Sequence, residues 1–253
     1  MPLVWENVDA NLNFFTDKIS RIKEQTDVIV LPEMFSTGFT MSSKTVAESM
    51  SGKAIQWMRQ QAAAKNCVLT GSIITKEKGK YYNRLIWMRP DGSFEKYDKR
   101  HLFRMANEQK YYSKGKQKRI VELKGWKICL MVCYDLRFPV WSRRVANTEN
   151  DYDVLLYVAN WPERRNHAWK SLLVARAIEN QSYVLGLNRV GLDGNNINYS
   201  GDSAVLNYLG EPMSNFSSNK ESIETTTISK KKLLDFRKSF PAELDADSFE
   251  IKQ

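Results

Sequence analysis

The chain has 253 residues, of which 42% are hydrophobic and 11% aromatic, and its formal net charge is +9. This apolar content is enough for a sizeable core and argues against a disordered chain. No apolar run approaches the roughly 20 residues that span a membrane. The lysines and arginines are scattered and lack the interleaved aromatic or glycine pattern of RNA-binding modules. We therefore expect neither a nucleic-acid nor a membrane partner.

The start of the chain and its cysteines indicate the compartment. Met1–Asn7 has neither a basic stretch nor an apolar h-region, so no secretory signal is expected. Three cysteines, Cys67, Cys129 and Cys133, are too few and too odd in number for a disulfide framework. We therefore expect a cytoplasmic protein. The sequence has no glycine-rich phosphate loop and no CxxC pair, so we expect no cofactor and no metal.

Hydrophobic periodicity predicts helices and strands that alternate along the chain. Leu12, Phe15 and Ile19 recur at helical spacing, and Asp9 is the expected N-cap. In chain order we expect a helix at 10–25, a strand at 27–31, a helix at 51–65, strands at 67–75, 81–88 and 93–97, a strand at 127–132, a helix at 139–147, a strand at 153–159, a helix at 167–180, strands at 182–190, 203–207 and 222–229, and a basic helix at 229–237. Without a linker or repeat, this alternation predicts one α/β domain over residues 1–253.

Cys133 is the first candidate for a reactive residue. It follows the apolar run 127–132 and precedes the polar turn Tyr134–Pro139, which contains Arg137. A nucleophilic cysteine needs such a junction, because the thiolate is the reactive form and nearby positive charge stabilises it. The alternative is a structural role, since free cysteine is among the most buried residue types.

Two further polar residues follow predicted strands. Glu33 comes just after Pro32, which ends the strand expected at 27–31, and Lys99 follows the hairpin strand. Ligands of α/β sheets gather beyond the carboxyl ends of strands, so Glu33, Lys99 and Cys133 are expected to converge. Singly, Glu33 also fits a surface cap and Lys99 a solvated loop charge. Together the three side chains supply a base, a cation and a nucleophile for acyl transfer.

In this hypothesis Glu33 accepts the thiol proton while the sulfur of Cys133 attacks an amide carbonyl. Lys99 and the backbone N–H of Tyr134 stabilise the oxyanion. Ammonia leaves after protonation by Glu33, and water then hydrolyses the thioester. A cysteine–histidine pair is the competing design, for which only His101 and His167 are available. Their spacing excludes neither.

These segments resemble the three catalytic signatures of the nitrilase, or carbon–nitrogen hydrolase, superfamily. The matching runs occur in the expected order at Leu31–Phe35, Tyr97–Phe103 and Cys133–Pro139. The resemblance implies that Glu33 is the general base, Lys99 stabilises the intermediate and Cys133 is the nucleophile. It also implies that Glu108 is a second glutamate, which positions the lysine and substrate. The implied fold is a four-layer α-β-β-α sandwich, usually paired into a homodimer or higher homo-oligomer.

Further segments resemble the ω-amidase branch, which hydrolyses 2-oxoglutaramate and 2-oxosuccinamate to the dicarboxylate and ammonia. They are Val4–Asn7, Ala159–Pro162, Arg176–Gln181, Asn188–Gly191, Tyr199–Ser203 and Phe236–Pro241. Neighbouring branches that hydrolyse N-carbamoyl compounds or deaminated glutathione share much of this frame. An N-carbamoyl amino acid or another short amide is therefore the alternative substrate, and a non-catalytic interaction protein with the same fold is a third interpretation.

A keto-acid ω-amide carries a carboxylate, which needs a cation in the site. Arg137, Arg164 and Arg165 are candidates, and the sequence does not choose among them. For Arg137 the alternative, which the sequence favours, is that it braces the turn after Cys133 and does not contact substrate. Residues that either line the pocket or pack in the core are Tyr134, Trp161, Phe35 and Met41.

One feature departs from the family pattern. Members begin with a full strand before the Trp-Glu-Asn segment, whereas only Met1–Val4 precede Trp5 here. This departure concerns the first strand of the inner sheet and the stability of the fold. The three catalytic segments are untouched.

Overall fold

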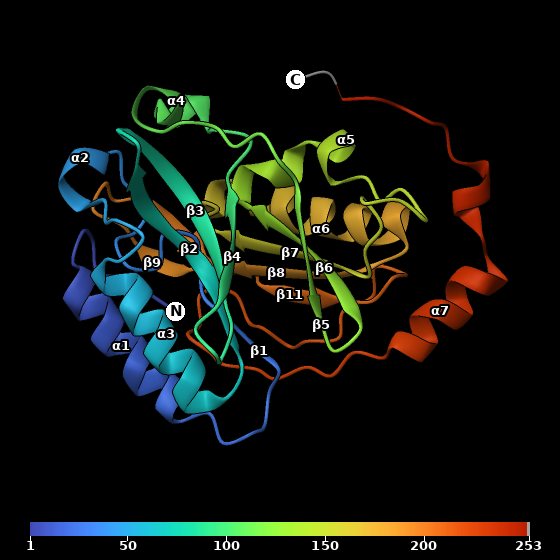
Figure 1. The fold of residues 1–253 in the computed structure, drawn as a ribbon, viewed down its shortest axis with the longest axis horizontal. Helices are drawn as coiled ribbons and strands as arrows, with labels where there is room; N and C mark the ends of the chain where they lie inside the picture. Colours follow the sequence, from blue (N-terminus) through green and yellow to red (C-terminus); the bar gives the residue numbers. More distant parts are fainter. Residues whose placement is uncertain (252–253) are drawn as a thin grey trace.

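The computed structural model describes residues 1–251 and contains two β-sheets packed face to face, with helices on both outer sides (Figure 1). The layers run helix, sheet, sheet, helix. The predicted four-layer α-β-β-α sandwich is therefore confirmed.

The first sheet has the strand order β1-β2-β3-β4. Its strands are β1 (Val28–Val30), β2 (Val68–Glu77), β3 (Lys80–Met88) and β4 (Phe94–Asp98). β1 runs parallel to β2, and the other pairs are antiparallel. Lys78 and Gly79 both have positive φ, as a two-residue hairpin turn requires. The β3–β4 register pairs Arg84 with Asp98, so Lys99 follows directly beside Asn83.

The second sheet has the order β11-β8-β7-β6-β5. Its strands are β5 (Arg119–Leu123), β6 (Trp126–Val132), β7 (Val154–Ala159), β8 (Tyr183–Asn188) and β11 (Ala204–Leu206). β6, β7 and β8 are parallel, so their carboxyl ends meet at one edge. Every residue of β7 is buried, because this sheet is covered on both faces. A small sheet pairs β9 (Val190–Leu192) with β10 (Asn198–Ser200).

Helices cover the two outer faces (Figure 1). α1 (Val8–Ser20) and α3 (Lys53–Lys65) pack on the first sheet, where α3 contacts β2 and β3. On the second sheet, α6 (Asn166–Asn180) contacts β8 and β11. The remaining α-helices are α2 (Ser43–Val46), α4 (Glu108–Tyr111), α5 (Pro139–Ser142) and α7 (Lys230–Ser239). The 3-10 turns are η1 (Arg104–Ala106), η2 (Cys133–Arg137), η3 (Glu163–Arg165) and η4 (Ala242–Asp245).

Apolar side chains fill the space between the layers. One cluster joins the facing sides of the two sheets and includes Trp87, Leu130 and Leu156. A second cluster seals α1 and α3 against the first sheet and includes Phe15 and Trp57. These two cores fix both sheets, and hence the positions of the strand ends that carry polar residues.

Most predicted elements are confirmed, and four details are wrong. Helix α1 begins at Val8, because the extended Asn7, not Asp9, accepts the capping bond from the N–H of Ala10. It ends at Ser20, before the polar residues 23–26, which have no apolar face to bury. The helix predicted at 139–147 stops after one turn at Ser142. Residues 222–229 form no strand, since no sheet ladder among residues 1–251 includes them.

The start of the chain forms no strand in the described structure. The carbonyl of Met1 accepts a hydrogen bond of 3.2 Å from the N–H of Val190. β1 pairs with β2 on one side only within residues 1–251.

A largely apolar cavity of about 400 Å³ lies against β1 and is also lined by β7, β8 and residues 222–228. Across the described 251 residues, none of the helices combines the length and apolar character needed to cross a membrane.

Candidate active site

Cys133 stands where strand β6 passes into the η2 turn. Its φ of 45° lies in the left-handed region, which is a strained conformation for a residue with a side chain. The residue is 8% exposed, and its Sγ lies 3.8 Å from the carbonyl oxygen of Asn160 at the end of β7. The junction therefore presents the thiol beyond the strand end, as the sequence predicted.

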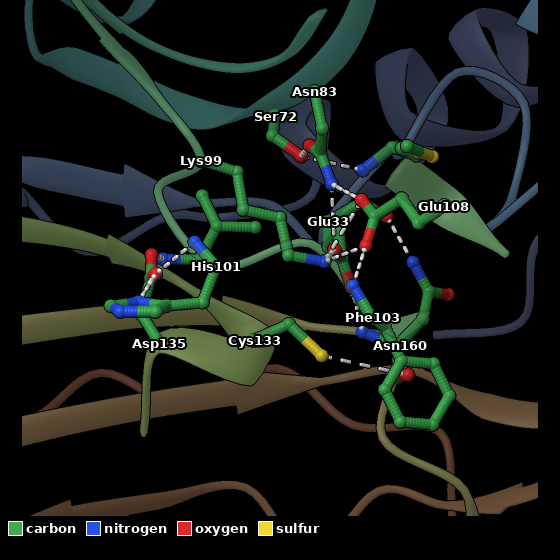
Figure 2. Close-up of polar contacts among 12 residues, drawn as sticks. Glu33, Ser72, Asn83, Lys99, His101, Phe103, Glu108, Cys133, Asp135 and Asn160 are labelled. Carbon is green, nitrogen blue, oxygen red and sulfur yellow. Dashed lines mark hydrogen bonds and ion pairs between the residues drawn. The ribbon is translucent and has the colours of Figure 1, made fainter. Parts of the chain in front are cut away.

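Glu33, Lys99 and Glu108 form a buried ion-pair cluster beside this thiol (Figure 2). The Nζ of Lys99 lies 2.9 Å from Oε1 of Glu33 and 3.0 Å from Oε2 of Glu108. All three side chains are fully buried. Figure 2 shows Glu33, Lys99 and Cys133 converging from three different strand ends. The predicted convergence of base, cation and nucleophile is present.

Neutral amides and a hydroxyl hold the two carboxylates. The Nδ2 of Asn83 donates to Glu33 at 2.7 Å, and its Oδ1 accepts from Ser72 at 2.8 Å. The backbone N–H of Asn160 donates to Oε2 of Glu33 at 2.8 Å. Glu108 also accepts a hydrogen bond from the N–H of Phe103 at 2.5 Å. Each carboxylate thus has several donors, as buried charges require.

Burial and neighbouring charge set the protonation states. Burial, together with the negative charge of Glu33, raises the pKa of the Cys133 thiol well above its usual range, and Lys99 partly offsets this. Burial lowers the pKa of Lys99, but Glu108 and Glu33 outweigh it and raise that pKa overall. Burial raises the pKa of Glu108, which Lys99 opposes. The resting site therefore holds a neutral thiol beside an ammonium, and the thiol needs a base before it can react.

The competing cysteine–histidine pair is absent from the described structure. Nδ1 of His101 bonds Asp135 at 2.7 Å, and its ring stacks on Phe138 with centroids 3.8 Å apart. His167 is exposed on α6. Neither histidine has a recorded contact with Cys133 among residues 1–251.

Asp135 is a structural anchor that the sequence reasoning missed. Its carboxylate accepts hydrogen bonds from the N–H of Val132, the hydroxyl of Tyr97, and both the N–H and the ring of His101. Asp135 is fully buried. These hydrogen bonds connect the η2 turn, which begins at Cys133, to the end of strand β4, which precedes Lys99. They therefore hold Cys133 near Lys99.

A cavity of about 600 Å³ opens above Cys133 and Lys99. The predicted substrate residues that line it are Tyr134, Arg137, Trp161, Arg164, Arg165 and Met41. Phe35 does not line it. Its ring packs in the core between Phe15 and Trp57, with centroid distances of 5.9 and 5.6 Å, so the prediction of a substrate contact is wrong there. The turn after β1, in which Met34 has a positive φ of 44°, points Glu33 to the site and Phe35 to the core.

The sequence analysis did not identify Asn83, Ser72 and Asn160 as site residues, and only Asn160 has a local signal that marks it. Asn83 and Ser72 lie within the β3 and β2 strands and point between the sheets only in the folded register. Asn160 was visible as a polar residue that ends a buried strand, which is the signal that identified Glu33 and Cys133.

Among residues 1–251, no group of three histidine, cysteine, aspartate or glutamate side chains is arranged to hold a metal ion.

The groups of this site have the separate chemical roles that an acyl transfer needs. A buried carboxylate and a buried amine lie beside the thiol at the base of this cavity, which is the arrangement that nucleophilic catalysis at an amide requires. Tyr134 lies in the first turn of η2, where backbone N–H groups have no acceptor within the turn. This N–H and Lys99 are available to an oxyanion.

Comparison with known proteins agrees with this geometry. The family model described as carbon–nitrogen hydrolase matches residues 1–238. The chain is 45% identical to omega-amidase YafV of Escherichia coli K12, over 99% of this chain and 95% of that protein. It is 32% identical to a 2-oxoglutaramate amidase of Bacillus subtilis, over 93% and 89% of the two chains.

A solved structure gives the same result. XC1258 of Xanthomonas campestris, a CN-hydrolase superfamily protein with an arsenic adduct in its active site, superposes with a TM-score of 0.95. The two sequences are 43% identical, and the match covers 99% of this chain and 96% of the other. The resemblance to the superfamily and to its ω-amidase branch is therefore confirmed. The chain belongs to the carbon–nitrogen hydrolase family.

Proposed function

We propose that this protein is an ω-amidase that hydrolyses the terminal amide of a short keto dicarboxylic acid, such as 2-oxoglutaramate or 2-oxosuccinamate. The observation that carries the proposal is the buried Glu33–Lys99–Glu108 cluster beside the Cys133 thiol. The similarity to the omega-amidase of Escherichia coli and the 2-oxoglutaramate amidase of Bacillus subtilis supports the choice of substrate.

The reaction begins with a proton transfer. Glu33 takes the proton of the Cys133 thiol while the sulfur adds to the amide carbon, and the carbonyl oxygen becomes an oxyanion. Lys99 and the N–H of Tyr134 stabilise that oxyanion. The C–N bond then breaks, and Glu33 returns its proton to the leaving ammonia. Glu108 holds Lys99 in place through both of its carboxylate oxygens.

Hydrolysis of the thioester completes the cycle. Water enters after ammonia leaves, and Glu33 removes its proton as the oxygen attacks the thioester carbon. The C–S bond breaks, the dicarboxylate leaves, and the thiol recovers its proton. The same carboxylate thus acts twice as base and twice as acid, which explains why it needs a fixed position.

Ammonia release from 2-oxoglutaramate tests the proposal directly. The parent protein should release ammonia, and Cys133→Ala should abolish the activity. Cys129→Ala is the matched control, because Cys129 is buried in the same β6 strand with no contact to the cluster. Ammonia release that survives Cys133→Ala would refute the mechanism. A parent that prefers an N-carbamoyl amino acid in a side-by-side panel would transfer the chemistry to the alternative substrate.

We further propose that the protein acts in the cytoplasm as a homodimer or higher homo-oligomer. All three cysteines are free, which suits a reducing compartment. Light scattering after gel filtration measures the oligomeric state, and a mass of one chain would contradict this part of the proposal.

A further inference from the structure

The cavity above Cys133 carries three guanidinium groups. Arg137 ends the η2 turn that Cys133 begins, and Arg164 and Arg165 lie in the η3 turn. Three cations that line one pocket repel one another, and burial further disfavours the partly buried ones. The pKa of Arg165 is lowered by burial, and further by the positive charges of Arg164 and Arg137.

No carboxylate within residues 1–251 forms an ion pair with these arginines. Two acidic residues line the same cavity, but neutral donors engage them. Glu6 accepts from the hydroxyl of Thr40, and Asp193 accepts from the hydroxyl of Tyr199 at 2.9 Å. The three guanidinium groups therefore have no carboxylate as a direct partner, and such groups favour an anionic ligand.

Aromatic rings hold two of the guanidinium groups in place. Arg137 lies over the ring of Trp161 at 5.0 Å, and Arg165 lies over the ring of Phe103 at 5.4 Å. The Nε1–H of Trp161 donates to the carbonyl of Arg165 at 2.9 Å, so one indole supports both arginines. A guanidinium that stacks on a ring keeps its in-plane N–H donors for a carboxylate. Nη1 of Arg165 has no hydrogen-bond partner within the described chain.

Arg164 lacks these features. It is exposed, and no ring or hydrogen bond that fixes its guanidinium is recorded in the described residues. An unfixed arginine loses more side-chain entropy on binding than one that is already held. The pocket thus favours Arg137 and Arg165 over Arg164.

We propose that Arg137 and Arg165 together bind the free carboxylate of the substrate, and that Trp161 is the positioning residue for both. This inference rests on the proposed function and makes it more specific. Arg137 stands four residues after Cys133 in a 3-10 turn, about 8 Å along its axis. The ligand is therefore a short amide whose carboxylate lies a few carbons from the scissile bond, which fits a four- or five-carbon dicarboxylate monoamide.

The first test compares two substrates of equal length. Arg137→Gln and Arg165→Gln are each expected to lower kcat/KM for 2-oxoglutaramate about 10- to 100-fold, the worth of a hydrogen bond to a charged group. Hydrolysis of pentanamide, which has no carboxylate, should stay within about threefold of the parent. Arg104→Gln is the control for charge at a distance, because Arg104 is exposed on the adjacent η1 turn and does not line the cavity.

A second test needs no turnover. The product 2-oxoglutarate should protect Cys133 of the parent from iodoacetamide, and both arginine variants should need about 10-fold more product for equal protection. Trp161→Leu should raise KM for 2-oxoglutaramate with little change in kcat, and Trp161→Phe should restore most of the loss. A general structural defect would instead lower kcat for both substrates.

The outcomes separate the two proposals. A parent without activity on 2-oxoglutaramate contradicts the proposed function, and the protection assay then decides the inference alone. An active parent whose Arg137 and Arg165 variants keep normal KM and normal protection overturns the inference. So does an Arg164→Gln variant with a larger loss than Arg165→Gln.

Discussion

Replacing Lys99 by methionine tests the electrostatics of the buried cluster. The ammonium lies 2.9 Å from Glu33 and 3.0 Å from Glu108, and all three groups are shielded from solvent. With a neutral thiol, the two carboxylates and one ammonium sum to a charge of −1. Lys99→Met makes the sum −2 in the same volume, unless one carboxyl takes up a proton.

The burial of the Glu33–Lys99–Glu108 cluster determines how strongly the stability of the Lys99→Met variant depends on pH. Removing one partner of a buried ion pair costs about 3–5 kcal/mol, which equals about 2–4 pK units at 1.36 kcal/mol each. The pKa of the Glu108 carboxyl, which burial already raises, should therefore rise further in the variant, because the ammonium that opposes this effect is gone. When a carboxyl has a higher pKa in the folded protein than in the unfolded chain, its protonation stabilises the folded protein. This stability is fully present below the pKa of the unfolded chain and is lost as the pH rises through the pKa of the folded protein. The stability gap between parent and variant should thus widen by about 3–5 kcal/mol from about pH 4.5 to pH 8.

Urea denaturation across this pH range measures the gap. Lys53→Met is the matched control, because Lys53 forms an exposed pair with Asp9 and its loss should give a small change without pH dependence. The double variant Lys99→Met with Glu108→Gln removes the second carboxylate and should flatten the pH dependence. A gap in the single variant that stays constant with pH would refute this account of the cluster. Its ammonia release should also fall at least about 100-fold, as for the loss of an oxyanion donor.

Three further outcomes are expected. Glu33→Gln should abolish hydrolysis because it removes the proposed base. It should nevertheless increase the rate at which iodoacetamide alkylates Cys133 near neutral pH, because it removes a negative charge that raises the thiol pKa. An unchanged alkylation rate would count against this explanation. Asp135→Asn should lower the free energy of unfolding by about 2–4 kcal/mol and reduce activity, since it breaks a fully buried hydrogen-bond network; both are measured by denaturation and ammonia release. Gly186→Ala should lower the free energy of unfolding by about 1–3 kcal/mol, because the new Cβ would meet a methyl of Leu173 at 2.5 Å. A melting temperature equal to that of the parent would show that α6 can shift away from the new Cβ.

The sequence predicted the convergence of Glu33, Lys99 and Cys133 because each follows a strand end. Glu33 and Cys133 come just after apolar runs, and Lys99 follows the hairpin strand; such positions face the ligand edge of a sheet. Glu108 has no such local signal and came only from the family resemblance. The α/β layering followed from the alternation of periods in the same way. The extent of the single domain over residues 1–253 stays a prediction.

The sequence could not predict what depends on register or on tertiary pairing. Asn83 enters the site because the β2–β3 hairpin places it opposite Ile74 and beside Ser72. Residues 222–229 have strand-like composition, but a strand also needs a partner edge, and none pairs with them among residues 1–251. The sequence could not decide whether Phe35 lines the pocket or packs in the core, because the turn after β1 sends Glu33 and Phe35 to different layers.

Asn160 shows how the fold sets the distance between base and nucleophile. Its backbone N–H bonds one oxygen of Glu33 at 2.8 Å, its side-chain amide donates to the Glu33 carbonyl at 2.5 Å, and its own carbonyl lies 3.8 Å from Sγ of Cys133. A single residue at the end of β7 therefore contacts groups from both sheets. Since β7 pairs with β6 in fixed register, any shift between the sheets would move Glu33 relative to Cys133 through this residue. The proton transfer thus depends on the packing of the two sheets as much as on the reacting side chains.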